Sequence, residues 1–170
     1  MYRKSQLIVE VACLGELWRE AVKWNQADDA DFRAPFVAEG WIYPEGTILG
    51  DGFRPVPEGS IGRWFCHGTV IIDSSRPEPH VATYQDFLFG TITPEALFPR
   101  DTLATAGIEG TDDRTQSAVR AVIGGTGEYL GATGQQTQRM IALNTSPFAG
   151  GTGDQSPCWR IEFDRRGLRR

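Results

Sequence analysis

The chain has 170 residues, of which 40% are hydrophobic and 23% charged, with a formal net charge of −5 and a pI of about 5.1. These values are typical of one ordinary globular domain that can build its own core. The acidic balance provides no basic face for nucleic acid or for an anionic membrane, so neither is an expected partner. No run of about eighteen apolar residues occurs, and this excludes a transmembrane helix.

Cysteine usage and the absence of a targeting signal indicate a reducing compartment. The three cysteines, Cys13, Cys66 and Cys158, are odd in number, widely spaced and without a C-x-x-C motif, so neither a disulfide framework nor a zinc site is expected. Glu10 interrupts the first apolar run, and no small-residue cleavage site follows it. We therefore expect a cytoplasmic protein with no metal and no cofactor.

The N-terminal part of the chain is ambiguous. Residues 6–13 are rich in β-branched side chains, as strands are, whereas residues 14–24 place Leu14, Leu17 and Trp18 at helical spacing. This segment is therefore expected to be either helical or extended. Residues 25–35 are polar and acidic and end at a proline, which predicts a loop that would cover a barrel mouth.

The rest of the chain consists of short apolar segments separated by turn residues. Further strands are expected at residues 36–43, 61–72, 81–89, 102–109, 116–123, 135–143 and 158–163. With one strand at the start, the count is about eight. Eight short antiparallel strands favour an all-β barrel that can just hold one small ligand, with a β-sandwich as the rival fold. We expect one domain over residues 1–170, with an N-terminal segment at 1–35, the barrel at 36–163 and a basic tail at 164–170 that has no assigned role.

A glycine-rich segment carries a family resemblance. Residues 123–134 place five glycines around Tyr129, where glycine permits a tight connection and the tyrosine would cap the barrel end. The spacing is not that of a phosphate-binding loop, and a strand rather than a helix is expected after it. The segment resembles the strand, turn and strand signature of the allene oxide cyclase and dirigent barrel superfamily.

Within that superfamily, the chain is most similar to the bacterial cyclases of spirotetronate and spirotetramate polyketide biosynthesis. The likeness rests on residues 82–86, on the glycine segment with Tyr129, and on residues 138–140, and it extends loosely over residues 36–143. It implies an eight-stranded barrel that forms a homodimer and performs an intramolecular [4+2] cycloaddition in natural-product (secondary) metabolism. Such a reaction needs no nucleophile and no metal. It needs a folded substrate and exclusion of water. The two histidines, His67 and His80, accompany no catalytic motif.

The same resemblance assigns the candidate site. Tyr84 aligns with a pocket tyrosine of the related cyclases, and strand alternation then directs Asp86 and Leu88 inward as well. Gln138 stands where one relative has a large aromatic residue, so the identity of the substrate does not carry over. The catalytic set expected is Arg120, Gln138 and Tyr84, and the substrate-binding set is Asp86, Gln136, Met140, Trp41, Trp64, His67, Leu88, Ala118 and Val122.

Arg120 is the main candidate. An arginine inside a barrel requires a partner, for which Asp86 is the natural choice. Either Arg120 or the amides of Gln136 and Gln138 would hydrogen-bond a ring carbonyl and so stabilise the transition state. The alternative places Arg120 outward in a salt bridge at a subunit contact. Tyr84, Met140 and the tryptophans could equally be core residues, and His67 a structural one.

Two other functions are consistent with the same sequence. A cyclase of a reactive intermediate, of the allene oxide cyclase or dirigent type, would need an inward acid such as Glu10 or Asp86. The dirigent arginine after the glycine turn is absent, because residues 132–134 are Ala-Thr-Gly. A non-catalytic carrier of a hydrophobic metabolite would use the same cavity without chemistry.

Overall fold

The computed structural model describes residues 5–19, 33–71, 80–91, 99–110, 116–147 and 155–166. Within these residues the chain forms eight strands and one short 3₁₀ turn, η1 (Gly127–Tyr129). The strands are β1 (Ser5–Arg19), β2 (Arg33–Pro44), β3 (Gly62–Ile71), β4 (His80–Phe89), β5 (Asp101–Gly110), β6 (Ala118–Thr126), β7 (Thr133–Pro147) and β8 (Gln155–Arg166). None of the helices among the described residues is long and apolar enough to cross a membrane.

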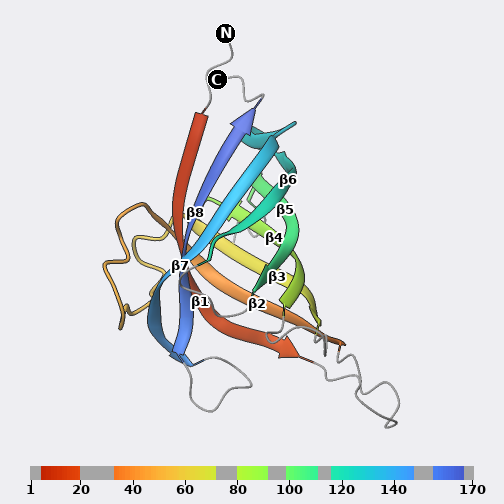
Figure 1. Ribbon diagram of the computed structural model, residues 1–170. Coiled ribbons are helices and arrows are strands. Elements are labelled where there is room, and N and C mark those ends of the chain that lie inside the picture. The colour runs from red at the N-terminus through yellow and green to blue at the C-terminus, as the bar shows by residue number, and fades with distance from the viewer. Residues whose placement is uncertain are drawn as a thin grey trace, which may run out of the picture.

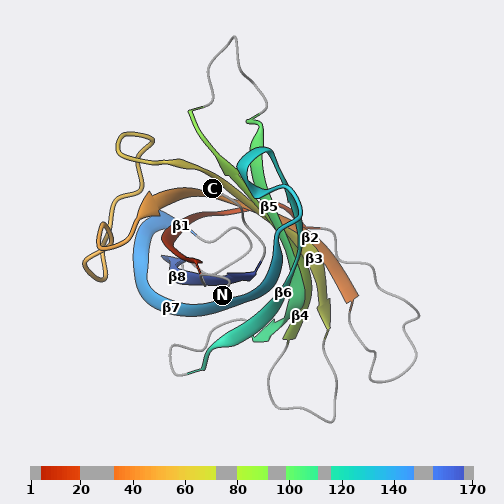
Figure 2. The same ribbon diagram turned by 90° about the horizontal axis from the view of Figure 1, so that it is seen from above.

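Every strand pairs antiparallel with its neighbours in sequence, and β8 pairs with β1, so the sheet closes into a barrel (Figures 1 and 2). The expected eight-stranded antiparallel barrel is confirmed, and the sandwich is wrong. Because the strands form a meander, β1, β3, β5 and β7 all end at one end of the barrel. The described part of the chain begins with β1 and finishes with β8 at the other end (Figure 1).

The helical interpretation of residues 14–19 is wrong, because they continue β1. The register of β1 against β2 shifts between Cys13 and Gly15 and again between Glu16 and Trp18. A bulge inserts one extra residue and so interrupts the two-residue alternation of a strand. Residues 20–24, and the greater part of the expected lid loop, lie outside the described residues.

Apolar side chains fill the part of the interior nearer the chain termini. Trp64 of β3, Phe87 of β4 and Phe163 of β8 are at most 1% exposed, and the rings of Phe87 and Phe163 meet edge to face with centroids 5.0 Å apart. Aromatic pairs at this distance add to the stabilisation that burial itself provides. At the same end, Tyr129 of the glycine segment packs against Phe89 with ring centroids 5.0 Å apart. A tyrosine at the end of the barrel was expected.

Glu10 is buried but serves the structure. Its carboxylate accepts hydrogen bonds from the backbone N–H of Gly46 at 2.9 Å and of Ile48 at 2.7 Å, and so holds the connection between β2 and β3 against β1. Both oxygens are occupied by these bonds. Glu10 is therefore not the inward acid that a dirigent-type reaction would need.

Candidate functional site

The inward face of β4 is the opposite of the expected one. Thr83, Gln85 and Phe87 are at most 2% exposed, whereas Tyr84 is 54% exposed on the outside of the barrel. The expectation that Tyr84, Asp86 and Leu88 project into the interior is wrong, because a strand shows its two faces alternately and the alignment on Tyr84 selected the wrong one.

The expected faces of β6 and β7 are confirmed. Arg120, Val122, Gln136, Gln138 and Met140 are all at most 8% exposed and share the inward parity of their strands. Ala118 has the same parity but is only half-buried, since it is the first residue of β6. Arg120 therefore does not form an outward salt bridge.

Polar side chains form a connected cluster inside the barrel on β4, β5, β6 and β7. It consists of Thr83, Gln85, Thr105, Glu109, Arg120, Gln136 and Gln138, which are hydrogen-bonded to one another. The inward residues of β5 run from Leu103 through Thr105 and Gly107 to Glu109, one residue before the strand ends. The interior thus changes from apolar to polar toward the end of the barrel opposite the chain termini.

Arg120 lies across β5 with its guanidinium held from two sides. Its Nε donates to Thr105 Oγ1 at 3.3 Å, and its Nη2 donates to the backbone carbonyl of Thr83 at 2.9 Å. A Cβ atom on Gly107 would lie 2.9 Å from Cγ of Arg120, closer than side-chain carbons approach. Glycine at position 107 therefore provides the space in which Arg120 lies.

Glu109, not Asp86, is the ionic partner of Arg120. Its carboxylate lies 3.4 Å from Arg120 Nη1, and it accepts hydrogen bonds from Gln138 Nε2 at 2.6 Å and Thr83 Oγ1 at 3.1 Å. Burial raises the pKa of Glu109 above its ordinary value, and the charge of Arg120 and the hydrogen bonds from Thr83, Gln85 and Gln138 oppose that rise. Burial likewise lowers the pKa of Arg120, which the charge of Glu109 opposes.

Two atoms of this cluster have no hydrogen-bond partner among the described residues. They are Arg120 Nη1, whose contact with Glu109 is ionic only, and Gln136 Oε1. Arg120 and Gln136 are paired across β6 and β7, so a free donor and a free acceptor belong to neighbouring side chains. Buried polar atoms without partners are uncommon, so the described part of the interior leaves one donor, Arg120 Nη1, and one acceptor, Gln136 Oε1, unsatisfied.

The remaining expected site residues lie elsewhere. Trp64 is buried in the apolar interior, and Trp41 is half-buried on the outside, where the guanidinium of Arg63 stacks 4.7 Å from its ring centroid. His67 is exposed on the outer wall, with Nε2 3.6 Å from Asp86 Oδ2 and its ring stacked on Tyr84. The expected structural contact of His67 exists, but it lies outside the barrel, as does half-buried Leu88.

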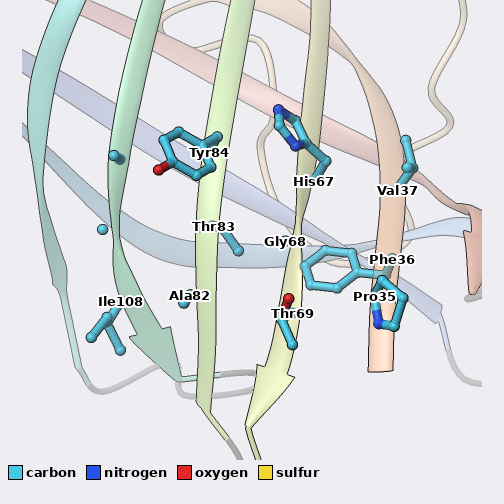
Figure 3. A pocket seen from close by; sticks show the side chains of 12 residues that line it. Pro35, Phe36, Val37, His67, Gly68, Thr69, Ala82, Thr83, Tyr84 and Ile108 are labelled. Atoms are coloured by element: carbon cyan, nitrogen blue, oxygen red, sulfur yellow. The ribbon is translucent and has the colours of Figure 1, made fainter. Parts of the chain in front are cut away.

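The outer wall over β2, β3, β4 and β5 is hollowed. This open depression has a volume of about 790 Å³, and Figure 3 shows His67, Tyr84, Thr69 and Ile108 around it. Its lining is mainly apolar. The three residues expected together in the interior, His67, Tyr84 and Asp86, are thus together on the outside. An enclosed cavity within the barrel stays a prediction.

Sequence reasoning did not select Glu109, Gln85, Thr83 or Thr105. The sequence of β5 did contain a signal. Its alternate residues Leu103, Thr105, Gly107 and Glu109 lie on one face of the strand, and the small residue among them, Gly107, lies opposite Arg120. Only the register of β5 against β6 shows that this face of β5 lies beside Arg120. Among the described residues, no group of three or more His, Cys, Asp and Glu side chains is arranged to hold a metal ion.

No protein-family model and no curated protein sequence matches the chain. Solved structures do resemble it. The pterocarpan synthase dirigent protein GePTS1 is 13% identical, with a TM-score of 0.54 over 94% of this chain and 88% of that one. The pterocarpan synthase dirigent protein PsPTS1 is 14% identical, with a TM-score of 0.52 over 97% of each chain. At these identities the likeness shows a shared fold, the dirigent-like β-barrel.

Proposed function

We propose that this barrel is a cofactor-independent cyclase that closes a ring within an apolar, linear polyketide-type substrate by an intramolecular [4+2] cycloaddition. The observation that carries the proposal is the buried cluster of Arg120, Glu109 and the three glutamines at the polar end of an otherwise apolar interior. Apolar walls would fold the chain of the substrate and exclude water, which favours a reactive conformer.

Arg120 would act on the substrate as a hydrogen-bond donor. Its Nη1 has no hydrogen-bond acceptor in the described part of the chain, and Thr105 and Thr83 hold the rest of the guanidinium in place. A carbonyl conjugated to the dienophile would accept from Nη1, and withdrawal of electron density lowers the barrier to cycloaddition. Gln138 would position Glu109, and Glu109 in turn Arg120.

Glu109 favours one second candidate. A buried carboxyl group with a raised pKa is suited to donate a proton, so it could assist ring closure of a reactive intermediate, as a dirigent-type cyclase would require. The two solved structures compared above are of proteins named pterocarpan synthase. The acid inside the barrel is Glu109, not Glu10 or Asp86, which the sequence suggested for this role.

The Glu109→Gln variant distinguishes the two reactions. Glutamine keeps the size of the side chain, but it replaces one acceptor oxygen by an NH2 donor and cannot supply a proton in the relevant pH range. For cycloaddition we expect the rate of ring closure of a linear diene–enone substrate to fall by at most about tenfold, because Arg120 loses part of its positioning, with no change in the pH dependence of kcat. A fall of about 10²-fold or more, with loss of the pH dependence of kcat, would contradict cycloaddition and favour proton transfer.

The matched control for that experiment is Glu162→Gln. Glu162 is a glutamate on the outer face of β8, paired with Arg160 at the surface, so its replacement should leave the rate unchanged. Binding of the same substrate without any acceleration by wild-type protein would contradict both cyclase proposals and indicate a carrier.

A further inference from the structure

The hydrogen bonds among the buried glutamines run in one direction. Glu109 is paired with Arg120, and its carboxylate can only accept hydrogen bonds. Gln138 therefore turns its Nε2 toward Glu109 Oε2, at 2.6 Å, and its Oε1 accepts from Gln85 Nε2 at 2.8 Å. The Oε1 of Gln85 in turn accepts from Gln136 Nε2 at 2.9 Å. Each amide is oriented by the one before it, so the carboxylate determines the orientation of all three glutamines.

Gln136 is the last member of this chain of hydrogen bonds. Its Nε2 has an acceptor for each of its two hydrogens, because Gln138 Oε1 lies 3.2 Å away in addition to Gln85 Oε1. Its Oε1 is buried and has no hydrogen-bond partner among the residues that the structure describes. Exchanging the oxygen and the nitrogen of this amide would place three acceptor oxygens against one another. The chain of hydrogen bonds therefore ends in an acceptor.

Arg120 presents the complementary group beside it. Arg120 and Gln136 are opposite each other in the register of β6 and β7, and both are buried inside the barrel. The Cβ atoms of such a pair are about 4.5–5.5 Å apart. Arg120 Nη1 is a buried donor that no described residue accepts from, since its contact with Glu109 is ionic only. An unsatisfied donor and an unsatisfied acceptor thus belong to directly facing side chains.

We propose that Gln136 is the specificity-determining residue of this site, and that its Oε1 accepts a hydrogen bond from an N–H or O–H group beside the carbonyl that Arg120 binds. The inference rests on the proposed function, in which Arg120 Nη1 donates to a carbonyl of the substrate. The polar head of the substrate then carries an acceptor and a donor on the same edge.

Few neutral groups have such an edge. A ketone, an ester or a lactone offers acceptors only, and its carbonyl would leave Gln136 Oε1 buried and unpaired. An open-chain secondary amide is trans, so its N–H and its carbonyl point in opposite directions. A lactam ring holds the amide cis, and a cyclic α-hydroxyenone has its enol O–H beside its carbonyl. A carboxylate does not fit, because Glu109 already balances the charge of Arg120 and a second buried anion would be unpaired.

The first test uses ligands that cannot cyclise. Saturated probes carry the same alkyl chain on a γ-lactam, on its N-methyl derivative or on a γ-lactone, and tryptophan fluorescence measures their dissociation constants. Wild type should bind the lactam at least about tenfold more tightly than the other two, since only its N–H satisfies Gln136 Oε1. A cyclic α-hydroxyenone with the same chain, compared with its methyl ether, distinguishes an enol head from a lactam head.

The second test removes the acceptor. In Gln136→Met a thioether, which accepts only weakly, replaces the amide, and the preference for the probe with the donor should fall below about threefold. Any general weakening of the cluster cancels in the ratio of the two dissociation constants. Gln135→Met is the matched control, because Gln135 is the neighbouring glutamine on β7 and is exposed. It should keep the full preference. Far-UV circular dichroism establishes that both variants are folded.

The inference and the proposed function fail in different ways. Equal binding within both probe sets by wild type, an undiminished preference in Gln136→Met, or its loss in Gln135→Met would overturn the role of Gln136. Cyclisation of lactam and lactone substrates with equal kcat/KM would overturn it too and leave the cyclase standing. Binding with the expected preference, but without cyclisation of a lactam-headed diene, would contradict the cyclase and support the role of Gln136. Failure of wild type to bind any probe would overturn both.

Discussion

Replacing Arg120 with methionine is expected to lower the free energy of unfolding by about 3 kcal/mol at neutral pH, because Glu109 loses its buried cation. The Arg120 side chain is fully buried, and the Glu109 side chain is 9% exposed. Water therefore cannot solvate the carboxylate in place of the arginine. Urea denaturation at neutral pH measures the change.

The double variant Arg120→Met/Glu109→Gln should recover most of that loss, because no unpaired charge remains in the interior. Asp86→Asn is the control, since the sequence pointed to Asp86 as the partner of Arg120 although it lies on the outer wall. That change should alter stability by less than about 0.5 kcal/mol. A loss below about 1 kcal/mol for Arg120→Met would contradict a buried ion pair.

The stability of the wild-type protein should depend on pH through Glu109. Its pKa in the folded state is raised above the ordinary value of 4.5, so the folded state binds more protons than the unfolded state above that pH. This contribution to stability is complete below pH 4.5 and is lost as pH rises through the folded pKa. Without the opposing charge of Arg120, the pKa in the Arg120→Met variant rises further, and its stability should fall over a wider pH range. Glu109→Gln should abolish the dependence.

Replacing Gly107 with alanine is expected to cost about 1–3 kcal/mol and to slow ring closure, because the added methyl group displaces Arg120. The new Cβ would lie 2.9 Å from Cγ, 3.1 Å from Cβ and 3.3 Å from Cα of Arg120. These are atoms near the backbone, so rotation of the end of the side chain cannot relieve the contact. The guanidinium would then leave its acceptors on Thr105 and Thr83.

Gly110→Ala is the matched control on the same strand. No atom lies within 4 Å of a Cβ at that position, so the change should be neutral within about 0.5 kcal/mol. Urea denaturation of both variants, with circular dichroism to establish the fold, makes the comparison. Equal stability of Gly107→Ala and wild type would show that Arg120 does not lie against β5 as described.

The strands could be predicted from sequence because turn residues separate the apolar segments and each segment is short. The expected strand at residues 81–89 lies within one residue of β4 (His80–Phe89), and the one at 102–109 within one residue of β5 (Asp101–Gly110). The bulges in β1 could not be predicted from the sequence in this way. They shift the register of β1 against β2, and the residue pattern of β1 alone does not contain that shift.

The interior residues were predicted from one aligned position on a strand and the alternation of its side chains. On β6 and β7 the likeness at position 138 gave the correct face for Arg120, Gln136 and Gln138. On β4 both faces mix apolar and polar residues, so the choice rested on the likeness of Tyr84 to a pocket tyrosine, and a shift of one residue inverts the whole face. Glu109 could not be predicted as the partner of Arg120, because the pairing depends on the register between strands and the residue pattern of one strand does not contain that register.

The most direct test of the proposed function is the stereochemistry of ring closure in a linear diene–enone substrate, with the wild-type protein compared with Arg120→Lys. Lysine keeps the charge beside Glu109 but loses the planar group that donates to Thr105, Thr83 and a carbonyl at once. We expect wild type to give one enantiomer faster than the background reaction, and Arg120→Lys to lose at least about tenfold in rate while remaining folded. A racemic product formed at the background rate with both proteins would contradict the proposal that this polar cluster promotes cyclisation.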